Sequence, residues 1–385
     1  MQADVPLGAF LSGGVDSSLI LALMQEQSSK PVQSFSIGVD NIQFNEAPFA
    51  KKVAKHLGTE HHELYINAKQ ARDVIPKLPK LYDEPFSDSS QIPTFLLSEM
   101  AQKHVKVSLS GDGGDEIFGG YNRYMLGHSI WPKIISMPKS LRKLLAGLIF
   151  SFSPTDWDKI MTPALYLAPQ RFRHTKIGDS LHKTAHILNS SSIQEIYNFL
   201  ISHWSIKENI VIGANNANTI LDNENKIIEK LSYPEQMMFF DTLTYLPGDI
   251  LVKLDRAAMG TSLETRTPFL DHRVIDLAWK LPLNMKIRNT EKKWCLKELL
   301  YKRVPKELIE RPKMGFSVPI GDWLRGPLRD WAEHLLDEKK MKESGYFNTS
   351  EIQQKWHQHI SKEYNWQHHL WDIIIFESWR KEEGL

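Results

Sequence analysis

The first 110 residues alternate between short apolar segments rich in β-branched residues and longer segments whose apolar residues recur at helical spacing. The predicted strands and helices that result are, in chain order, residues 5–12, 18–27, 32–39, 45–58, 61–66, 71–82, 92–104 and 105–110. Neighbouring parallel strands need long crossover connections, so this alternation predicts an α/β fold with a doubly wound parallel sheet. Ligands in such sheets bind beyond the carboxyl ends of the strands.

Beyond about residue 125 the pattern changes to helices with few strand signals. Apolar spacing near three and four predicts helices at residues 192–204, 232–246, 272–281 and 294–304, while residues 136–225 have weaker periodicity. We therefore expect two parts, an α/β core over residues 1–125 and a mostly helical part over residues 126–385.

The charge balance and the single cysteine exclude several classes of function. Lys and Arg number 47 against 46 Asp and Glu, so the net charge of +1 gives no broad field that would gather nucleic acid or an acidic membrane. Cys295 alone cannot form an intramolecular disulfide or a cysteine-rich zinc site, which is typical of the cytoplasm. No segment approaches the roughly 20 apolar residues that span a bilayer, and the opening residues lack signal-peptide features. We expect a cytoplasmic protein.

The sequence SGGVDSS, residues 12–18, lies between a predicted strand and a predicted helix. Backbone N–H groups at Gly13 and Gly14, together with the helix N-terminus, favour the binding of phosphate oxygens. The hydroxyl groups of Ser12 and Ser17 are further hydrogen-bond donors. No Lys follows as in a Walker loop, and no third glycine as in a dinucleotide fingerprint. Asp16 would repel phosphate unless a cation intervenes. It is either a Mg²⁺ ligand or an acid that caps the helix.

A second glycine-rich loop, GDGGDE at residues 111–116, follows the strand predicted at 105–110. Asp112, Asp115 and Glu116 would repel one another unless cations or donors lie between them. Asp115 is therefore a second candidate Mg²⁺ ligand, and a surface acidic turn is the alternative. Because both loops follow strands of a parallel sheet, they could face one site.

Two further charged segments have both structural and functional interpretations. The segment 253–271 carries Lys253, Arg256 and Arg266 among several acids, which predicts an ion-pair network or, alternatively, an arginine that binds a substrate carboxylate. The histidines of residues 355–371 have spacings that do not place two imidazoles on one helical face, so an amphipathic terminal helix with inward Trp side chains is favoured over a metal site.

The first loop resembles the PP-loop of the N-type ATP pyrophosphatases, which cleave ATP between its α and β phosphates. The ordered set PLGAFLSGGVDSS, SFSIGV, SLSGDGGDEIFGGY, LETRTPFLDH and EKKWCLKELL resembles the synthetase domain of glutamine-hydrolysing asparagine synthetases. The resemblance runs from about residue 3 to the last helices. It implies an adenine nucleotide alpha hydrolase-like sheet, ATP and Mg²⁺ as cofactors, and a site shared with the Lys293 region.

The resemblance also implies roles for single residues. Asp16 and Asp115 would share Mg²⁺, and Lys293, or its neighbour Lys292, would neutralise pyrophosphate as it forms. Asp112 stands where the family usually has Glu and is tied to acyl-adenylate formation and amine attack. The implied nucleotide contacts are Leu11, Ser12, Gly13, Gly14, Asp16, Ser17, Ile37, Ser110 and Gly111. Apolar Leu11 and Ile37 would also suit plain core.

The implied function is that of an ATP-dependent amide-forming ligase. Aspartate would be adenylated with release of pyrophosphate, and ammonia would then displace AMP. The alternatives are the same chemistry on another acid, such as a sugar acid of a surface polysaccharide, and an inactive ATP-binding regulatory domain. A transfer-RNA-modifying enzyme is disfavoured by the balanced charge and the single cysteine.

The resemblance raises one expectation about the nitrogen source and one about assembly. The first loop follows Met1 within a dozen residues, so we expect the family's N-terminal glutaminase domain to be absent from this sequence, as in a fragment. Glutamine would then provide ammonia through a missing or separate glutaminase domain. A homodimer is expected from the relatives.

Overall fold

The computed structural model describes residues 3–39, 45–166, 177–205, 208–214, 220–222, 228–310 and 318–385. The chain forms two compact units. The first comprises Met1–Tyr121, Met238–Pro319 and Ile375–Leu385, and the second comprises Asn122–Met237 and Ile320–Ile374. The first unit thus combines the α/β segment with later parts of the chain, and the domain boundary at residue 125 stays a prediction.

A parallel sheet of five strands is the centre of the first unit. Its order is β3-β2-β1-β4-β5, with β1 at Leu7–Phe10, β2 at Gln33–Val39, β3 at Glu60–Ile66, β4 at Val107–Leu109 and β5 at Glu264–Arg266. The predicted α/β class, the parallel sheet and the first four strands are confirmed. The fifth strand was not predicted, because its three residues, Glu-Thr-Arg, contain no apolar run.

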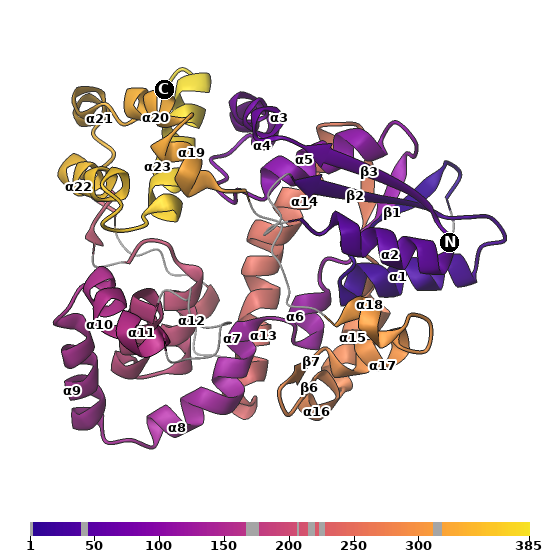
Figure 1. Cartoon of the computed structure of the whole chain (residues 1–385), viewed down its shortest axis with the longest axis horizontal. Helices are drawn as coiled ribbons and strands as arrows, with labels where there is room; N and C mark the ends of the chain where they lie inside the picture. Colours follow the sequence, from indigo (N-terminus) through magenta and orange to yellow (C-terminus); the bar gives the residue numbers. More distant parts are fainter. Residues whose placement is uncertain are drawn as a thin grey trace. The chain divides into compact units, whose positions relative to one another are not determined.

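Helices cover both faces of this sheet, as a doubly wound fold requires (Figure 1). Helices α1 (Val15–Glu26) and α2 (Ala47–Leu57) lie on one side, and α5 (Gln91–Ala101) and α14 (Leu251–Met259) lie on the other. Gly58 ends α2 in the left-handed conformation. The helical character predicted for residues 71–82 is confirmed, but it is divided among α3 (Ala68–Arg72), a 3-10 helix at Ile75–Lys77 and α4 (Leu78–Tyr82), because Pro76 and Pro79 each favour the start of a new helix.

The remaining elements of the first unit are short. They are α6 (Gly114–Phe118), α15 (His272–Lys280), α16 (Leu283–Lys286), the hairpin of β6 (Ile287–Arg288) and β7 (Glu291–Lys292), α17 (Trp294–Leu300) and α18 (Lys306–Ile309). The helices predicted at 272–281 and 294–304 are thus confirmed as α15 and α17.

Helix α1 is buried along most of its length, which explains why its apolar residues do not form a single stripe. Ile20, Leu21 and Met24 belong to a core that also contains Leu296 and Leu300 of α17. Each buried aliphatic side chain of this size contributes roughly 1.5–3 kcal/mol. This packing fixes the start of α1 relative to the start of α17, although nearly 280 residues separate Asp16 from Lys293.

The second unit is helical. Its helices include α7 (Asn122–Met125), α8 (Trp131–Ile135), α9 (Lys139–Phe150), α10 (Pro154–Tyr166), α11 (Ile177–Asn189), α12 (Ile193–Ile201), α19 (Ile320–Arg325), α20 (Arg329–Leu335), α21 (Glu338–Ser344) and α22 (Thr349–Ile360), and the boundaries between the units fall near α13 (Tyr233–Leu243) and within α23 (Gln367–Glu382). Helices α12 and α13 confirm those predicted at 192–204 and 232–246.

The histidine-rich region near the end of the chain forms two helices, α22 and α23, where one terminal helix was expected. Trp356 and Trp371 are buried in them, so the inward packing of tryptophan is confirmed. Among the described residues, no group of three or more His, Cys, Asp or Glu side chains is arranged to hold a metal ion.

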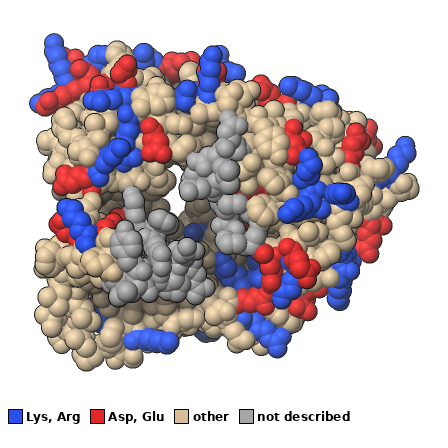
Figure 2. Space-filling model, viewed as in Figure 1, with Lys and Arg blue, Asp and Glu red and all other residues tan. Residues whose placement is uncertain are grey.

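Figure 2 shows basic and acidic side chains interspersed over the visible face, in keeping with the balanced composition. None of the described helices combines the length and the apolar character that a membrane span needs.

Candidate active site

Two glycine-rich loops leave the sheet side by side at the carboxyl ends of β1 and β4. These strands are neighbours, with Ala9 opposite Leu109. The sheet's hydrogen bonding continues into both loops, because Leu11 N–H donates to Phe35 O and Ser110 N–H donates to the carbonyl of Arg266, each at 2.8 Å. The register of the sheet therefore brings the two loops to one place.

Glycine is required where the loops touch. A Cβ atom on Gly111 would lie 2.9 Å from both the Cβ of Asp16 and the backbone nitrogen of Ser17, and a Cβ on Gly114 would lie 2.7 Å from Asp16 Oδ1. Gly13 has a φ of +74°, and a Cβ there would lie 2.8 Å from the backbone nitrogen of Ala50. The second loop can approach Asp16 this closely only because it lacks side chains at these positions.

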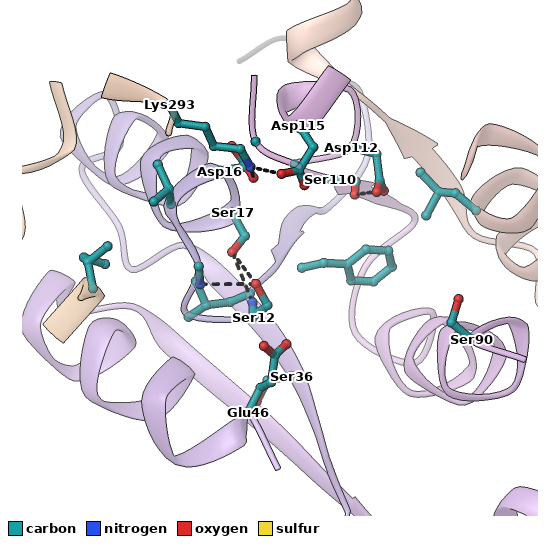
Figure 3. A pocket seen from close by; sticks show the side chains of 18 of the residues that line it. Ser12, Asp16, Ser17, Ser36, Glu46, Ser90, Ser110, Asp112, Asp115 and Lys293 are labelled. Atoms are coloured by element: carbon teal, nitrogen blue, oxygen red, sulfur yellow. Dashed lines mark hydrogen bonds and ion pairs between the residues drawn. The ribbon is translucent and has the colours of Figure 1, made fainter. Parts of the chain in front are cut away.

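Asp16 from the first loop and Asp115 from the second face the same lysine (Figure 3). Lys293 Nζ lies 2.6 Å from Asp115 Oδ1 and forms a hydrogen-bonded ion pair with Asp16 Oδ2 as well. Lys293 is only 6% exposed. Its φ of +54° is uncommon for a residue other than glycine, and such backbone strain is concentrated at functional sites.

The charge state of this cluster follows from its contacts. Burial lowers the pKa of Lys293, but Asp16 and Asp115 outweigh burial and hold that pKa well above its usual range. The lysine is therefore an ammonium ion. It is not one of two solvated lysines at a helix start, although Lys292 beside it also lines the cavity described below.

Two structural alternatives from the sequence are wrong. Asp16 does not cap α1, because Gly14 is the N-cap residue and no side chain caps that end. The second loop is not a surface acidic turn, because Glu116 is 1% exposed and accepts a 2.5 Å hydrogen bond from the Tyr121 hydroxyl. Burial raises the pKa of Glu116 to about 7.

The donor set of Asp16 and Asp115 fits Mg²⁺. Mg²⁺ bound to a nucleotide keeps water and phosphate oxygens as ligands and takes only one or two carboxylates from the protein. The pair satisfies this requirement, since both side chains are mostly buried and both contact one cationic group.

A cavity of about 800 Å³ opens beside this cluster. This volume is in the range of small-molecule sites. Of the residues predicted for the site, all but Gly13 line it: Leu11, Ser12, Gly14, Asp16, Ser17, Ile37, Ser110, Gly111, Asp112, Asp115 and Lys293. Leu11 and Ile37 are also buried in the core, at 2% and 4% exposure, so a backbone contact to nucleotide at these positions stays a prediction.

The polar groups of the cavity lie in three directions (Figure 3). Lys293 is at one end with the two aspartates, Ser36 and Glu46 lie at a second, and Ser90 lies at a third. Asp112 lies between Lys293 and Ser90 in this view, and accepts a 2.5 Å hydrogen bond from Ser110 Oγ. In the first loop, Ser12 Oγ and Ser17 Oγ are 3.0 Å apart.

Four charged residues of the cavity were missed as site residues, namely Glu46, Lys253, Lys297 and Glu310. Glu46, 8% exposed, begins α2 and was read only as part of that helix. Lys253 was read as one member of a charged segment, and its partner Asp88, 2.8 Å away, lies 165 residues earlier. The local sequence around a charged residue does not indicate which distant residue it will contact.

The arginines considered for substrate recognition lie elsewhere. Arg256 pairs with Asp83 at 2.8 Å, and Arg266 pairs with Glu264 at 2.5 Å. Both side chains are nearly half exposed, and neither is among the described residues that line the cavity. These contacts are separate ion pairs on the surface.

Comparison with known proteins identifies relatives over almost the whole sequence. The sequence model of the asparagine synthase family matches residues 1–381. Asparagine synthetase [glutamine-hydrolyzing] 1 of Bacillus subtilis is 31% identical over 98% of this chain and 56% of its own length. A putative asparagine synthetase [glutamine-hydrolyzing] of Mycobacterium bovis is 32% identical over 98% of this chain and 55% of its own.

A third relative is similar to a shorter part of this chain. Putative asparagine synthetase [glutamine-hydrolyzing] 2 of Methanocaldococcus jannaschii is 36% identical over 68% of this chain and 46% of its own length. The chain thus spans about half the length of the curated relatives that it matches. The match of the family model and the length of these alignments show that the chain belongs to the asparagine synthase family.

Proposed function

We propose that this chain carries the ATP-dependent, amide-forming half of an asparagine synthetase reaction. In the first step, an oxygen of the aspartate side-chain carboxylate attacks the α-phosphorus of ATP, and pyrophosphate leaves. In the second step, ammonia attacks the acyl carbon of the adenylate, the bond from that carbon to the AMP oxygen breaks, and asparagine and AMP are released. The ammonia is free or derived from glutamine.

One observation carries this proposal: a buried lysine lies between two aspartates at the meeting point of two loops that follow parallel strands. Such a cluster suits a reaction in which negative charge accumulates on a departing pyrophosphate, because phosphoryl transfer depends on positioning and electrostatic stabilisation. The position beyond the strand ends is where nucleotides bind in this fold class.

In this proposal Asp16 and Asp115 hold Mg²⁺, which when bound offsets the charge of the phosphate oxygens. Lys293 contributes a permanent positive charge at the same end of the cavity, where the pyrophosphate would leave. The first loop has backbone N–H groups and the hydroxyls of Ser12 and Ser17 available for phosphate oxygens. Lys293, the N-cap residue of α17, compensates for the absence of a Walker-type lysine in that loop.

Asp112 is proposed to act in the second step. Ser110 holds its carboxylate at 2.5 Å, so the group has one defined orientation beside the strand end. From there it can accept a proton from the ammonium group that forms as ammonia adds to the acyl carbon.

The products test the proposal. The chain incubated with ATP, Mg²⁺, aspartate and an ammonium salt should form asparagine, AMP and pyrophosphate in equal amounts. Asp16→Asn should lower the rate by at least about a hundredfold, as loss of one transition-state charge contact does. Formation of ADP and phosphate would contradict the mechanism, and ATP binding without AMP formation would favour a regulatory domain instead.

A further inference from the structure

Lys253 lines the cavity and forms an ion pair with Asp88 just outside the lining. Lys253 Nζ is 2.8 Å from Asp88 Oδ2. Ser90 donates two hydrogen bonds to Asp88, from its backbone N–H at 2.9 Å and from its hydroxyl at 2.7 Å. The Tyr82 hydroxyl donates to the backbone carbonyl of Lys253 at 3.1 Å. Both members of the pair are therefore held in one geometry.

The pair is ionised and mostly buried. The side chains of Lys253 and Asp88 are 15% and 23% exposed. Burial raises the pKa of Asp88, but Lys253 and the hydrogen bonds from Ser90 outweigh burial and lower that pKa to about 2. Burial lowers the pKa of Lys253, but Asp88, Asp249 and Asp112 outweigh it and raise that pKa well above its usual range.

Lys253 has hydrogen-bonding capacity left toward the cavity. An ammonium group has three donors, and among the described residues the one side-chain acceptor of Lys253 is Asp88. Lys253 lines the cavity whereas Asp88 does not, so Asp88 positions the lysine and the lysine faces any ligand. A charged hydrogen-bond donor in the partly buried wall of a cavity favours binding of an anion.

The place of Lys253 in the cavity indicates which anion it would meet. Ser90, which holds its partner, lies on the far side of Asp112 from Lys293 in Figure 3. In-line transfer puts the attacking carboxylate on the side of the α-phosphorus away from the leaving pyrophosphate. If pyrophosphate leaves toward Lys293, the acid enters on the side of Asp112, and its remote end reaches Lys253.

We propose that Lys253, positioned by Asp88, is a specificity-determining residue that binds the second, non-reacting carboxylate of a dicarboxylate substrate. This inference rests on the proposed adenylation of a carboxylate. It selects amino or plain dicarboxylates of about the length of aspartate over monocarboxylates such as a sugar acid. The surface ion pairs of Arg256 and Arg266 have no part in this selection.

The test compares three acids and three variants of the full chain. Aspartate has both carboxylates and an amine, succinate lacks the amine, and 3-aminopropanoate lacks the second carboxylate. For each acid, exchange of labelled pyrophosphate into ATP gives kcat and KM, and equilibrium dialysis with α,β-methylene ATP measures binding of labelled aspartate. The variants are Lys253→Met, Lys253→Arg and, as a matched control on the same helix, Arg256→Met, which removes an exposed ion pair outside the cavity.

Lys253→Met should raise KM for aspartate and succinate roughly 10- to 100-fold, the range for one hydrogen bond to a charged group. KM for ATP and kcat/KM for 3-aminopropanoate should stay within about twofold of the parent chain, because the charge of Lys253 would contact neither. Lys253→Arg should retain most of the aspartate affinity, and Arg256→Met should match the parent chain.

Other outcomes would overturn the inference in distinguishable ways. If Lys253→Met binds aspartate as the parent chain does, or loses 3-aminopropanoate and aspartate activity equally, then the ion pair is structural and adenylation stands. If the parent chain prefers 3-aminopropanoate or another monocarboxylate to aspartate, the substrate class is wrong and adenylation again stands. If no acid supports exchange while ATP binds, the proposed function itself fails.

Discussion

Replacing Lys293 by Met removes the cation from between two buried carboxylates. Methionine keeps most of the volume and the flexible stem of lysine, so packing against the loops changes little. Asp16 and Asp115 then face one another without a cation between them. We expect this change to lower the stability of the chain as well as its activity. The stability can be measured without the reaction, so it tests the charge cluster independently of catalysis.

The size of the effect follows from the contacts. At 2.6 Å, and with an effective dielectric constant of about 20, the pair of Lys293 with Asp115 is worth about 6 kcal/mol before desolvation. Desolvation offsets part of this energy, and loss of one partner from a buried ion pair typically costs about 3–5 kcal/mol. We therefore expect Lys293→Met to lower the free energy of unfolding by about 3–5 kcal/mol without metal.

Urea unfolding followed by tryptophan fluorescence measures this loss, and Mg²⁺ provides the second readout. Mg²⁺ in tenfold excess over its dissociation constant should return about 1.4 kcal/mol to Lys293→Met, and less to the parent chain, whose lysine already neutralises the carboxylates. Lys280→Met is the control, because Lys280 of α15 forms an exposed 2.6 Å ion pair with Asp276 and does not line the cavity.

The control should lose less than about 1 kcal/mol and should respond to Mg²⁺ as the parent chain does. A loss below about 1 kcal/mol in Lys293→Met would refute the view that its charge is needed between the aspartates. Equal stabilisation of both variants by Mg²⁺ would refute the assignment of the aspartates as its ligands.

Three further predictions concern the loop, the nucleotide and pH. Gly111→Ala should abolish most ATP binding measured by calorimetry, because its Cβ would lie 2.9 Å from the backbone of the first loop, whereas Gly147→Ala, with nothing within 4 Å in α9, should bind ATP normally and gain up to about 1 kcal/mol of stability. Glu46→Gln should raise KM for ATP about tenfold in steady-state assays if this buried carboxylate accepts hydrogen bonds from the nucleotide, and an unchanged KM would exclude that role. His359 has a pKa that burial and the nearby Arg325 lower to about 4, so the unfolded state binds the proton more readily. Its contribution, at most about 3 kcal/mol, is complete above pH 6.5 and is lost as the pH falls toward 4; His359→Asn should flatten the pH dependence of urea unfolding over that window.

The elements that the sequence predicted best are those with a strong local pattern. The strands before Ser12 and Ser110 are apolar runs that end at glycines, and a parallel sheet brings such ends to one edge. Asp16 was ambiguous because a carboxylate in a first helical turn also suits a cap. The structure excludes the cap, because Gly14 is the N-cap residue of α1, and the role of Asp16 as a Mg²⁺ ligand stays a proposal.

The features that the sequence did not predict depend on contacts between segments that are distant along the chain. Strand β5 has no apolar run of its own and exists because β4 offers it an edge. Asp88 lies in a polar segment that reads locally as a turn, and 165 residues separate it from Lys253. Periodicity and motif spacing describe neighbours along the chain, so ion pairs of this kind become visible only when the helices are placed on the sheet.

Aspartate labelled with ¹⁸O in its side-chain carboxylate tests the central claim most directly. If that carboxylate attacks the α-phosphorus of ATP and ammonia later breaks the acyl–oxygen bond, then one ¹⁸O atom remains on the phosphate of AMP. Mass spectrometry of the AMP formed with aspartate and ammonium should therefore show one label per molecule. AMP without label, or label found in ADP or inorganic phosphate instead, would contradict adenylation of the substrate in this cavity.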